Sequence, residues 1–186
     1  MPEIAEVTID LTKALAIEGF MNPPELEWLA QQAQTHKRIA EVGSYYGRST
    51  RALCDHAIGE VHSFDDFFGP RDLAMDYRKR MAIFDTFTKN MTEHIDSGKL
   101  IIHDEDHDLV QPEGLFDMIF IDGSHEYFDF KRDLEKWIPF LDTGGLLSGH
   151  DYDLSYPGIL QALFETLGPN CIGVAPNTTI WYGQSR

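Results

Sequence analysis

The chain has 186 residues, the usual length of one domain, and 42% of them are hydrophobic, which is enough for a sizeable core. Its 31 acidic and 15 basic residues give a formal net charge of −16, and such a surface repels the phosphate backbone of nucleic acids. No apolar run approaches the roughly 18 residues of a membrane span, and no basic and apolar leader opens the chain. We therefore expect a cytoplasmic protein of one domain that binds neither nucleic acid nor membrane.

Apolar periodicity divides the chain into alternating helices and strands. Helices are expected at 24–35, 48–57, 71–95, 127–140 and 157–167, and strands at 38–42, 60–65, 99–103, 116–122 and 146–149. The segment 171–182 is typical of a hairpin around Pro176 and Asn177. This alternation predicts an α/β fold with a doubly wound, mostly parallel sheet, to which the hairpin adds one antiparallel strand. Within the single domain 1–186 we separate an N-terminal helical segment, 1–36, from a core, 37–186.

A glycine-containing turn follows the first predicted strand. Gly43 and Gly47 let the backbone turn tightly and approach a ligand, and the helix that begins near Ser49 points free backbone N–H groups at the same place. An α/β protein binds nucleotides or nucleosides at such a turn. The glycine spacing is not G-x-G-x-x-G, so the usual dinucleotide fingerprint is absent. A plain tight turn without a ligand is the simpler interpretation of this segment alone.

Polar residues, most of them acidic, follow five predicted strands, at 41–44, 65–66, 104–106, 122–125 and 150–151. Ligands of doubly wound folds bind at the carboxyl ends of the strands, and buried charges are costly unless they are paired, so this repetition favours a binding site over core architecture. Asp65 ends the second strand, where a carboxylate can accept hydrogen bonds from ribose hydroxyls. Asp66 takes that role if the register is shifted by one residue.

Two adjacent strands are expected to bring Asp122, His125, His150 and Asp151 to one rim of the sheet. A histidine with an ordinary pKa of about 6.5 can accept a proton at neutral pH, so His125 is a candidate base. Asp122 with the pair His150 and Asp151 could also chelate a divalent cation. Each histidine alone would more often be a surface residue, and it is the shared rim that favours a functional cluster.

The stretch Glu-Val-Gly-Ser-Tyr-Tyr-Gly-Arg-Ser-Thr at 41–50 resembles motif I of class I S-adenosylmethionine (SAM) methyltransferases and the corresponding stretch of catechol O-methyltransferase. Asp-Gly-Ser-His-x-Tyr at 122–127, with Gly-Gly-x-x-x-x-His-Asp at 144–151, resembles small bacterial enzymes grouped with macrolide and rhamnosyl O-methyltransferases and with cephalosporin hydroxylase-associated enzymes. The similarity runs from about residue 18 to residue 182. It implies a Rossmann-like, seven-stranded sheet of order 3-2-1-4-5-7-6 with the last strand antiparallel, and SAM as the cofactor.

The resemblance also implies roles for individual residues. It assigns SAM binding to Glu41, Gly43, Ser44, Tyr45, Gly47, Ser49, Asp65, Asp66, Glu105, Asp106 and Asp122. It makes His125, beside Asp122, the catalytic base, and Asp122, His150 and Asp151 the ligands of a divalent metal. Magnesium prefers oxygen ligands, so the imidazole of His150 favours manganese or iron, weak binding, or no metal at all.

The function expected from the sequence is methyl transfer from SAM to a hydroxyl of a small-molecule acceptor. The sequence does not identify the acceptor, and in so short a chain a homodimer could complete the acceptor pocket. Two alternatives stay open. One is a SAM-binding accessory or hydroxylase-associated protein without methyl transfer, which would share every cofactor motif. The other is a nicotinamide-dependent dehydrogenase, which the missing G-x-G-x-x-G motif disfavours.

Overall fold

The structure is a computed structural model that describes residues 8–68, 77–105 and 110–184. Its seven-stranded sheet has the order β3-β2-β1-β4-β5-β7-β6. The strands are β1 (Arg38–Val42), β2 (Glu60–Phe64), β3 (Leu100–His103), β4 (Phe116–Ile121), β5 (Leu141–Gly149), β6 (Gly173–Val174) and β7 (Trp181–Gln184). Strands β1 to β5 pair in parallel, whereas β7 is antiparallel to β5 and to β6. The predicted α/β class, strand order and antiparallel strand are confirmed.

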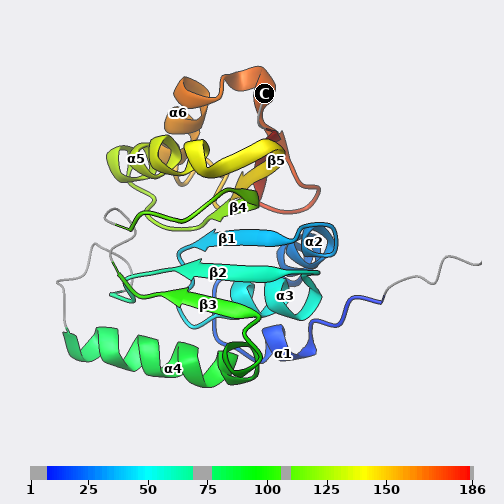
Figure 1. Cartoon of the computed structure of the whole chain (residues 1–186). Helices are drawn as coiled ribbons and strands as arrows, with labels where there is room; N and C mark the ends of the chain where they lie inside the picture. Colours follow the sequence, from blue (N-terminus) through cyan, green and yellow to red (C-terminus); the bar gives the residue numbers. More distant parts are fainter. Residues whose placement is uncertain (1–7, 69–76, 106–109, 185–186) are drawn as a thin grey trace, which may run out of the picture.

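The helices cover the sheet in two groups (Figure 1). They are α1 (Thr12–Leu15), α2 (Pro23–Ala33), α3 (Arg48–His56), α4 (Tyr77–Asp96), α5 (Tyr127–Trp137) and α6 (Pro157–Thr166). Helices α1 to α4 contribute to one hydrophobic core, in which Leu53 and Phe87 join Val61 of β2. Helices α5 and α6 contribute to the other core, in which Trp137 joins Phe64 of β2. Alternate residues of β2 thus enter opposite cores, as strands buried on both faces do.

The predicted helix at 127–140 ends earlier than expected. Helix α5 stops at Trp137, a 3-10 turn follows over Ile138–Phe140, and β5 begins at Leu141 rather than at residue 146. Pro139 explains this end, because a proline has no backbone N–H to donate within a helix. The glycine pair after Thr143 therefore lies inside β5, where the pairing with β4 shifts register.

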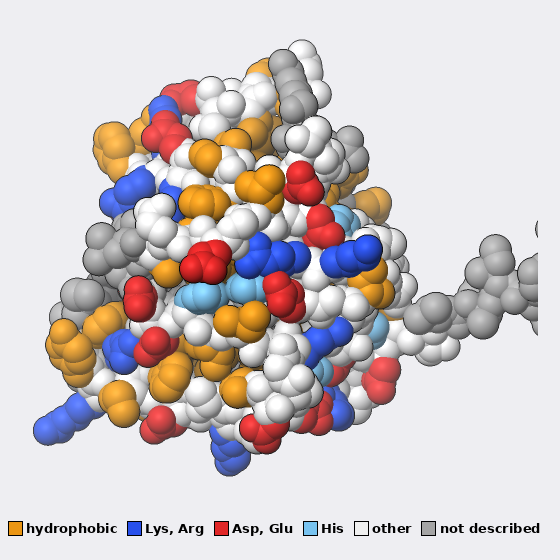
Figure 2. Space-filling view, viewed as in Figure 1, with side chains coloured by type: hydrophobic (Ala, Val, Ile, Leu, Met, Phe, Trp, Pro, Cys, Tyr) orange, Lys and Arg blue, Asp and Glu red, His pale blue; other side chains and the backbone are white. Residues whose placement is uncertain are grey.

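Charge is mixed over the surface seen in Figure 2. Acidic and basic side chains are interspersed across the face that carries β1 to β3. The excess of acidic residues behind the net charge of −16 therefore does not form one continuous acidic patch on this face. In the residues that the structure describes, no helix is both long enough and apolar enough to cross a membrane.

Candidate active site

The carboxyl ends of the parallel strands form one continuous edge, toward which the arrowheads of β1, β2 and β3 point in Figure 1. After each of four strands, the backbone N–H of the first residue donates a hydrogen bond to the last residue of the neighbouring strand in the sheet. These bonds run from Gly43 to Phe64 (2.9 Å), Asp65 to His103 (3.2 Å), Asp122 to Val42 (2.8 Å) and His150 to Ile121 (3.1 Å). The structure therefore brings the predicted residues after β1, β2, β4 and β5 to one edge of the sheet.

The glycine turn has a structural reason that the sequence did not reveal. Gly43 has a φ of +89°, and a Cβ atom there would collide with the backbone carbonyl of Asp122. Gly47, with a φ of +90°, is the residue before α3. Between them Tyr45 is also left-handed, with a φ of +50°, and its ring lies 3.9 Å from the ring of Tyr46. The conformation of the turn is thus determined in part by its close packing against the backbone that follows β4.

Glu41 lies beneath this turn and is fully buried. Its carboxylate accepts hydrogen bonds from the hydroxyls of Ser44, at 2.7 Å, and Thr50. Burial raises the pKa of Glu41 to about 7, although the hydroxyls of Ser49, Thr50 and Ser44 oppose the shift. Glu41, Ser44 and Ser49 are all buried, so their side chains support the turn from inside.

The acids after β2 are already engaged with the turn. The carboxylate of Asp65 accepts backbone hydrogen bonds from Ser44 (2.7 Å), Tyr45 (2.8 Å) and Phe67 (2.6 Å). Asp66 accepts one from Phe68, at 3.0 Å.

Burial raises the pKa of Asp65 despite its three hydrogen bonds. Of the predicted residues after β3, Glu105 is exposed, and Asp106 lies outside the described residues. Of these two predicted SAM-binding residues, the structure therefore describes only Glu105.

Five side chains, Glu25, Asp122, His125, His150 and Asp151, meet after β4 and β5, and we call them the rim cluster. His150 Nε2 lies 3.1 Å from Glu25 Oε1, and His150 Nδ1 lies 3.1 Å from Asp151 Oδ1 and 3.7 Å from Asp122 Oδ1. His125 Nε2 lies 2.7 Å from Asp151 Oδ2. The four residues predicted to share this rim do meet, and Glu25 of α2 joins them.

The carboxylates of the rim cluster favour the protonated form of His150. Burial lowers the pKa of His150, but hydrogen bonds to Asp151 and Glu25 outweigh it and raise the pKa to about 11. Burial likewise opposes the ionisation of Glu25, yet the hydrogen bond to His150 brings its pKa to about 2. Burial, with Asp151 nearby, raises the pKa of Asp122 to about 6. The hydrogen bond to Asp151 raises the pKa of His125.

Glu25 and Thr179 are site residues that the sequence reasoning missed. The amide and hydroxyl of Thr179 donate to Glu25 Oε1 at 3.1 and 3.0 Å. Glu25 Oε2 accepts from the backbone N–H of Asn22, and the Asn22 side chain in turn accepts from the backbone N–H of Glu25. The spacing of Asn22 and Glu25 matches a capping box, which is visible in the sequence. It accounts for Glu25 by a local role and gives no sign of the contacts with His150 and Thr179.

The three residues predicted as metal ligands differ from the three whose ligand atoms lie close together in the structure. Both ring nitrogens of His150 face carboxylates, and a protonated ring has no lone pair for a metal. Instead Asp122, His125 and Asp151 each offer a ligand atom, and these atoms lie within 4.8 Å of one another. A cation there would lie close to the charged His150, which disfavours a divalent ion. The arrangement of these residues therefore does not suit a metal ion that has His150 as a ligand.

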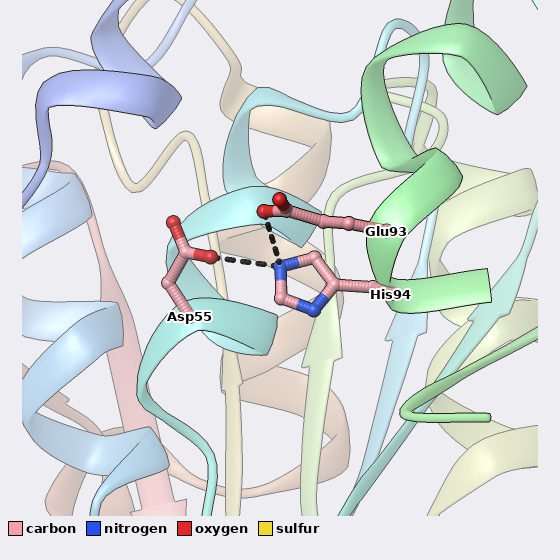
Figure 3. Close-up of side chains that lie close together, drawn as sticks. All are labelled: Asp55, Glu93 and His94. Atoms are coloured by element: carbon pink, nitrogen blue, oxygen red, sulfur yellow. Dashed lines mark hydrogen bonds and ion pairs between the residues drawn. The ribbon is translucent and has the colours of Figure 1, made fainter. Parts of the chain in front are cut away.

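A second group of acids and histidine, Asp55, Glu93 and His94, joins α3 to α4 (Figure 3), and we call it the helix cluster. His94 Nε2 lies 2.7 Å from Asp55 Oδ1 and 3.8 Å from Glu93 Oε1. Two cations already pair with these acids: Arg51 contacts both, and Lys13 Nζ lies 2.8 Å from Glu93. Because α3 and α4 end here before β2 and β3 begin, the helix cluster lies near the amino ends of the strands.

Comparison with known proteins places the chain among methyltransferases. TrmI, a tRNA (m1A58) methyltransferase from Aquifex aeolicus, is 18% identical, with a TM-score of 0.68 over 95% of this chain and 76% of that one. An O-methyltransferase from Bacillus cereus, solved with S-adenosylhomocysteine (SAH), is 14% identical, with a TM-score of 0.66 over 97% and 94%. TomG, an O-methyltransferase of tomaymycin synthesis from Streptomyces achromogenes, solved with SAM, is 14% identical, with a TM-score of 0.64 over 90% and 82%.

These structural likenesses establish the shared fold. No curated protein sequence gives a significant match. A family model described as a methyltransferase domain matches residues 40–152, which is more than half of the chain and includes the glycine turn, Asp65, Asp122 and the pair His150–Asp151. The protein therefore belongs to this family of methyltransferase domains and is a SAM-dependent methyltransferase.

Proposed function

We propose that the protein transfers the methyl group of SAM to a hydroxyl oxygen of a small-molecule acceptor, with His125 as the general base. The observation that carries this proposal is the pair of His125 and Asp151 at the edge where the strands end, with 2.7 Å between Nε2 and Oδ2. The His125 side chain is 45% exposed, so an acceptor can reach it, whereas that of Asp151 is 14% exposed. A carboxylate that orients a histidine and favours its protonation is a recurrent base arrangement.

The residues around the glycine turn suit SAM, whose sulfonium and ammonium groups are cationic. Asp65, Asp66 and Asp122 follow β2 and β4 along one edge, and together they provide negative charge beside the turn. We assign SAM to this edge, with Asp65 or Asp66 at the ribose hydroxyls and Asp122 near the methionine part. The buried Glu41, Ser44 and Ser49 then act by shaping the turn, and Tyr45 flanks the ligand.

The mechanism follows from the position of His125. Bound SAM supplies an electrophilic methyl group. Asp151 holds the His125 ring through Nε2, which leaves Nδ1 to take the proton of the acceptor hydroxyl. As that O–H bond breaks, the oxygen forms a bond to the methyl carbon and the carbon–sulfur bond breaks, which leaves SAH. His125 then releases its proton to water. Holding the two reactants at the near-attack distance of about 3–3.5 Å supplies much of the acceleration.

His125 cannot serve both as this base and as a metal ligand through the same lone pair. We propose the base role, because the imidazolium of His150 already neutralises part of the carboxylate charge that would attract a divalent cation. If a metal is bound after all, it would be held by Asp122 and Asp151 and would lower the pKa of the acceptor hydroxyl.

A small-molecule acceptor is favoured by charge. The net charge of −16 opposes binding of a polyanion, although one relative in fold modifies tRNA. The alternative, a SAM-binding protein that transfers no methyl group, has the same cofactor edge, and only turnover separates it from an enzyme.

The test is a transfer assay with methyl-labelled SAM against a panel of small hydroxyl compounds, with unmodified tRNA in a parallel reaction. We expect labelled product with an O–CH₃ signal by NMR from one class of hydroxyl compound, and undiminished rates in excess chelator. Label on tRNA, or on a nitrogen, would contradict the proposed acceptor. Loss of activity in chelator, restored by a divalent metal, would replace the metal-free mechanism. SAM binding without transfer to any compound would favour the accessory protein.

A further inference from the structure

Four side chains of the rim cluster form a line from the interior to the surface. Glu25 Oε1 lies 3.1 Å from His150 Nε2, His150 Nδ1 lies 3.1 Å from Asp151 Oδ1, and Asp151 Oδ2 lies 2.7 Å from His125 Nε2. Carboxylate and imidazole alternate along the line. The exposed fraction of the side chains rises in the same order, from 2% to 9%, 14% and 45%. The base is therefore the outer end of a line that begins at a buried carboxylate.

That buried carboxylate is fixed at both oxygens. Glu25 Oε1 accepts from the amide and the hydroxyl of Thr179, at 3.1 and 3.0 Å, and Oε2 accepts from the backbone N–H of Asn22, at 2.9 Å. A charge so far from water is tolerated only with such partners. Since Glu25 cannot move without losing these bonds, the ring of His150 that faces it is fixed as well.

Asp151 links the two imidazoles of the line. Its backbone is left-handed, with a φ of +62°, a conformation that aspartate adopts more often than most residues with a Cβ. Its two carboxylate oxygens point to different imidazoles, one to His150 and one to His125. The His150 ring therefore restrains the same carboxylate that orients the base.

We propose that Glu25 is a positioning residue for methyl transfer: through the ring of His150 it holds Asp151 in the orientation that aligns His125. This inference rests on the proposed function in that His125 is the base. A purely structural role, in which Glu25 only joins α2 to the turn before β7, would require the same bonds to Thr179 and Asn22 but no effect beyond His150.

The test compares Glu25→Gln with Glu27→Gln, which removes a charge from the exposed side of the same helix, α2. Protein with ¹⁵N-labelled histidine is studied by NMR with SAH bound, and the signals are assigned with His125→Gln and His150→Gln. We expect both ring nitrogens of His150 to carry protons in the parent protein. In Glu25→Gln the signals of His150 and of His125 should both change, while Glu27→Gln leaves them as they are.

Turnover gives the second readout once an acceptor is known. Glu25→Gln should lower kcat by about 10-fold to 100-fold, the size of effect that a misplaced catalytic group produces. It should leave the affinity for SAH within about twofold, because the described hydrogen bonds and ion pairs of Glu25 go to Asn22, Thr179 and His150 rather than to the turn after β1. If the His150 signals change while the His125 signals and kcat do not, the proposal is overturned and Glu25 has only a structural role.

A second variant keeps the test decisive if Glu25→Gln does not fold. Thr179→Val removes the hydroxyl that contacts both Glu25 and His150, at 3.0 and 3.1 Å, and leaves the carboxylate in place. A smaller change of the His150 and His125 signals is expected, and unaltered His125 signals would overturn the proposal. Because NMR needs no acceptor, absence of methyl transfer in the parent protein would count against the proposed function and not against the link from Glu25 to His125.

Discussion

The rim cluster and the helix cluster are built from the same kinds of side chain, but they balance their charges differently. In the helix cluster the acids Asp55 and Glu93 are paired with Arg51 and Lys13, two permanent cations. In the rim cluster the partners of three acids are imidazoles, whose charge depends on their surroundings. The pKa of Asp55 stays below its ordinary value, because its bonds to His94 and Arg51 outweigh burial, whereas burial raises that of Asp122 to about 6.

The difference shows why donor geometry alone is a weak guide to function. Both clusters bring three potential metal ligands within 4.8 Å of one another. In the helix cluster a divalent cation would have to displace or repel Arg51 and Lys13, so the cluster is best explained as an ion-pair network that joins α1, α3 and α4. Of the two, only the rim cluster lies at the carboxyl ends of the strands, where the ligands of doubly wound folds bind.

The largest expected effect separates the two clusters by activity. His125→Ala should lower methyl transfer by about 10²-fold to 10⁴-fold, the usual contribution of a general base, and leave SAM affinity nearly unchanged. His94→Ala, the matched change in the helix cluster, should leave the rate within about twofold. Steady-state rates with the native acceptor check both. Equal losses in the two variants would mean that the effect is one of folding rather than of catalysis.

The second effect concerns stability and its pH dependence. The pKa of Glu25 is lowered from 4.5 to about 2. Its ionised carboxylate therefore stabilises the fold above pH 4.5, and this contribution to stability is lost as the pH falls through about 2. His150, with a pKa raised from 6.5 to about 11, stabilises the fold below pH 6.5, and this is lost as the pH rises through about 11.

Breaking such a buried pair costs about 3 kcal/mol. Glu25→Gln should therefore lower the free energy of unfolding most between pH 4.5 and 6.5, and less on either side. Denaturant titrations at several pH values, with Glu27→Gln as the control, check this. A loss that does not vary with pH would show that the charges of Glu25 and His150 are not coupled.

The third effect is on cofactor binding. Asp65→Ala should weaken the binding of SAM and SAH by at least tenfold, about 1.4 kcal/mol, because it removes the proposed ribose partner and also the carboxylate that holds the backbone of Ser44 and Tyr45. Asp55→Ala, which removes an acid from the helix cluster, should leave the affinity unchanged. Calorimetry measures both. If Asp66→Ala is the more damaging variant, the ribose acid is Asp66.

The smallest effect belongs to the helix cluster. The Glu93 side chain is 50% exposed, and ion pairs of such side chains contribute about 0.2–1 kcal/mol. Glu93→Gln should cost stability within that range at low ionic strength and less at high ionic strength, because salt screens exposed charges. Thermal unfolding at two salt concentrations measures this. A metal-dependent gain in stability that Glu93→Gln abolishes would instead make the helix cluster a cation site.

The sequence predicted the fold well because its signals are local. Apolar runs bounded by glycine turns marked β1 and β4, and polar residues at the strand ends marked the functional edge. What it could not predict were contacts between distant segments. Glu25 and Thr179 are 154 positions apart, and the capping box already accounted for Glu25 locally. Nor could spacing show that Gly43 makes room for the carbonyl of Asp122.

The structure of a complex with SAH would test the central claim, that the edge after β1, β2 and β4 binds the cofactor beside the rim cluster. We expect the ribose hydroxyls at the carboxylate of Asp65 or Asp66, and the sulfur on the side of Asp122 and His125, with the helix cluster unchanged and no ligand near it. SAH bound elsewhere, or with its sulfur turned away from His125, would contradict the assignment of the rim cluster as the active site.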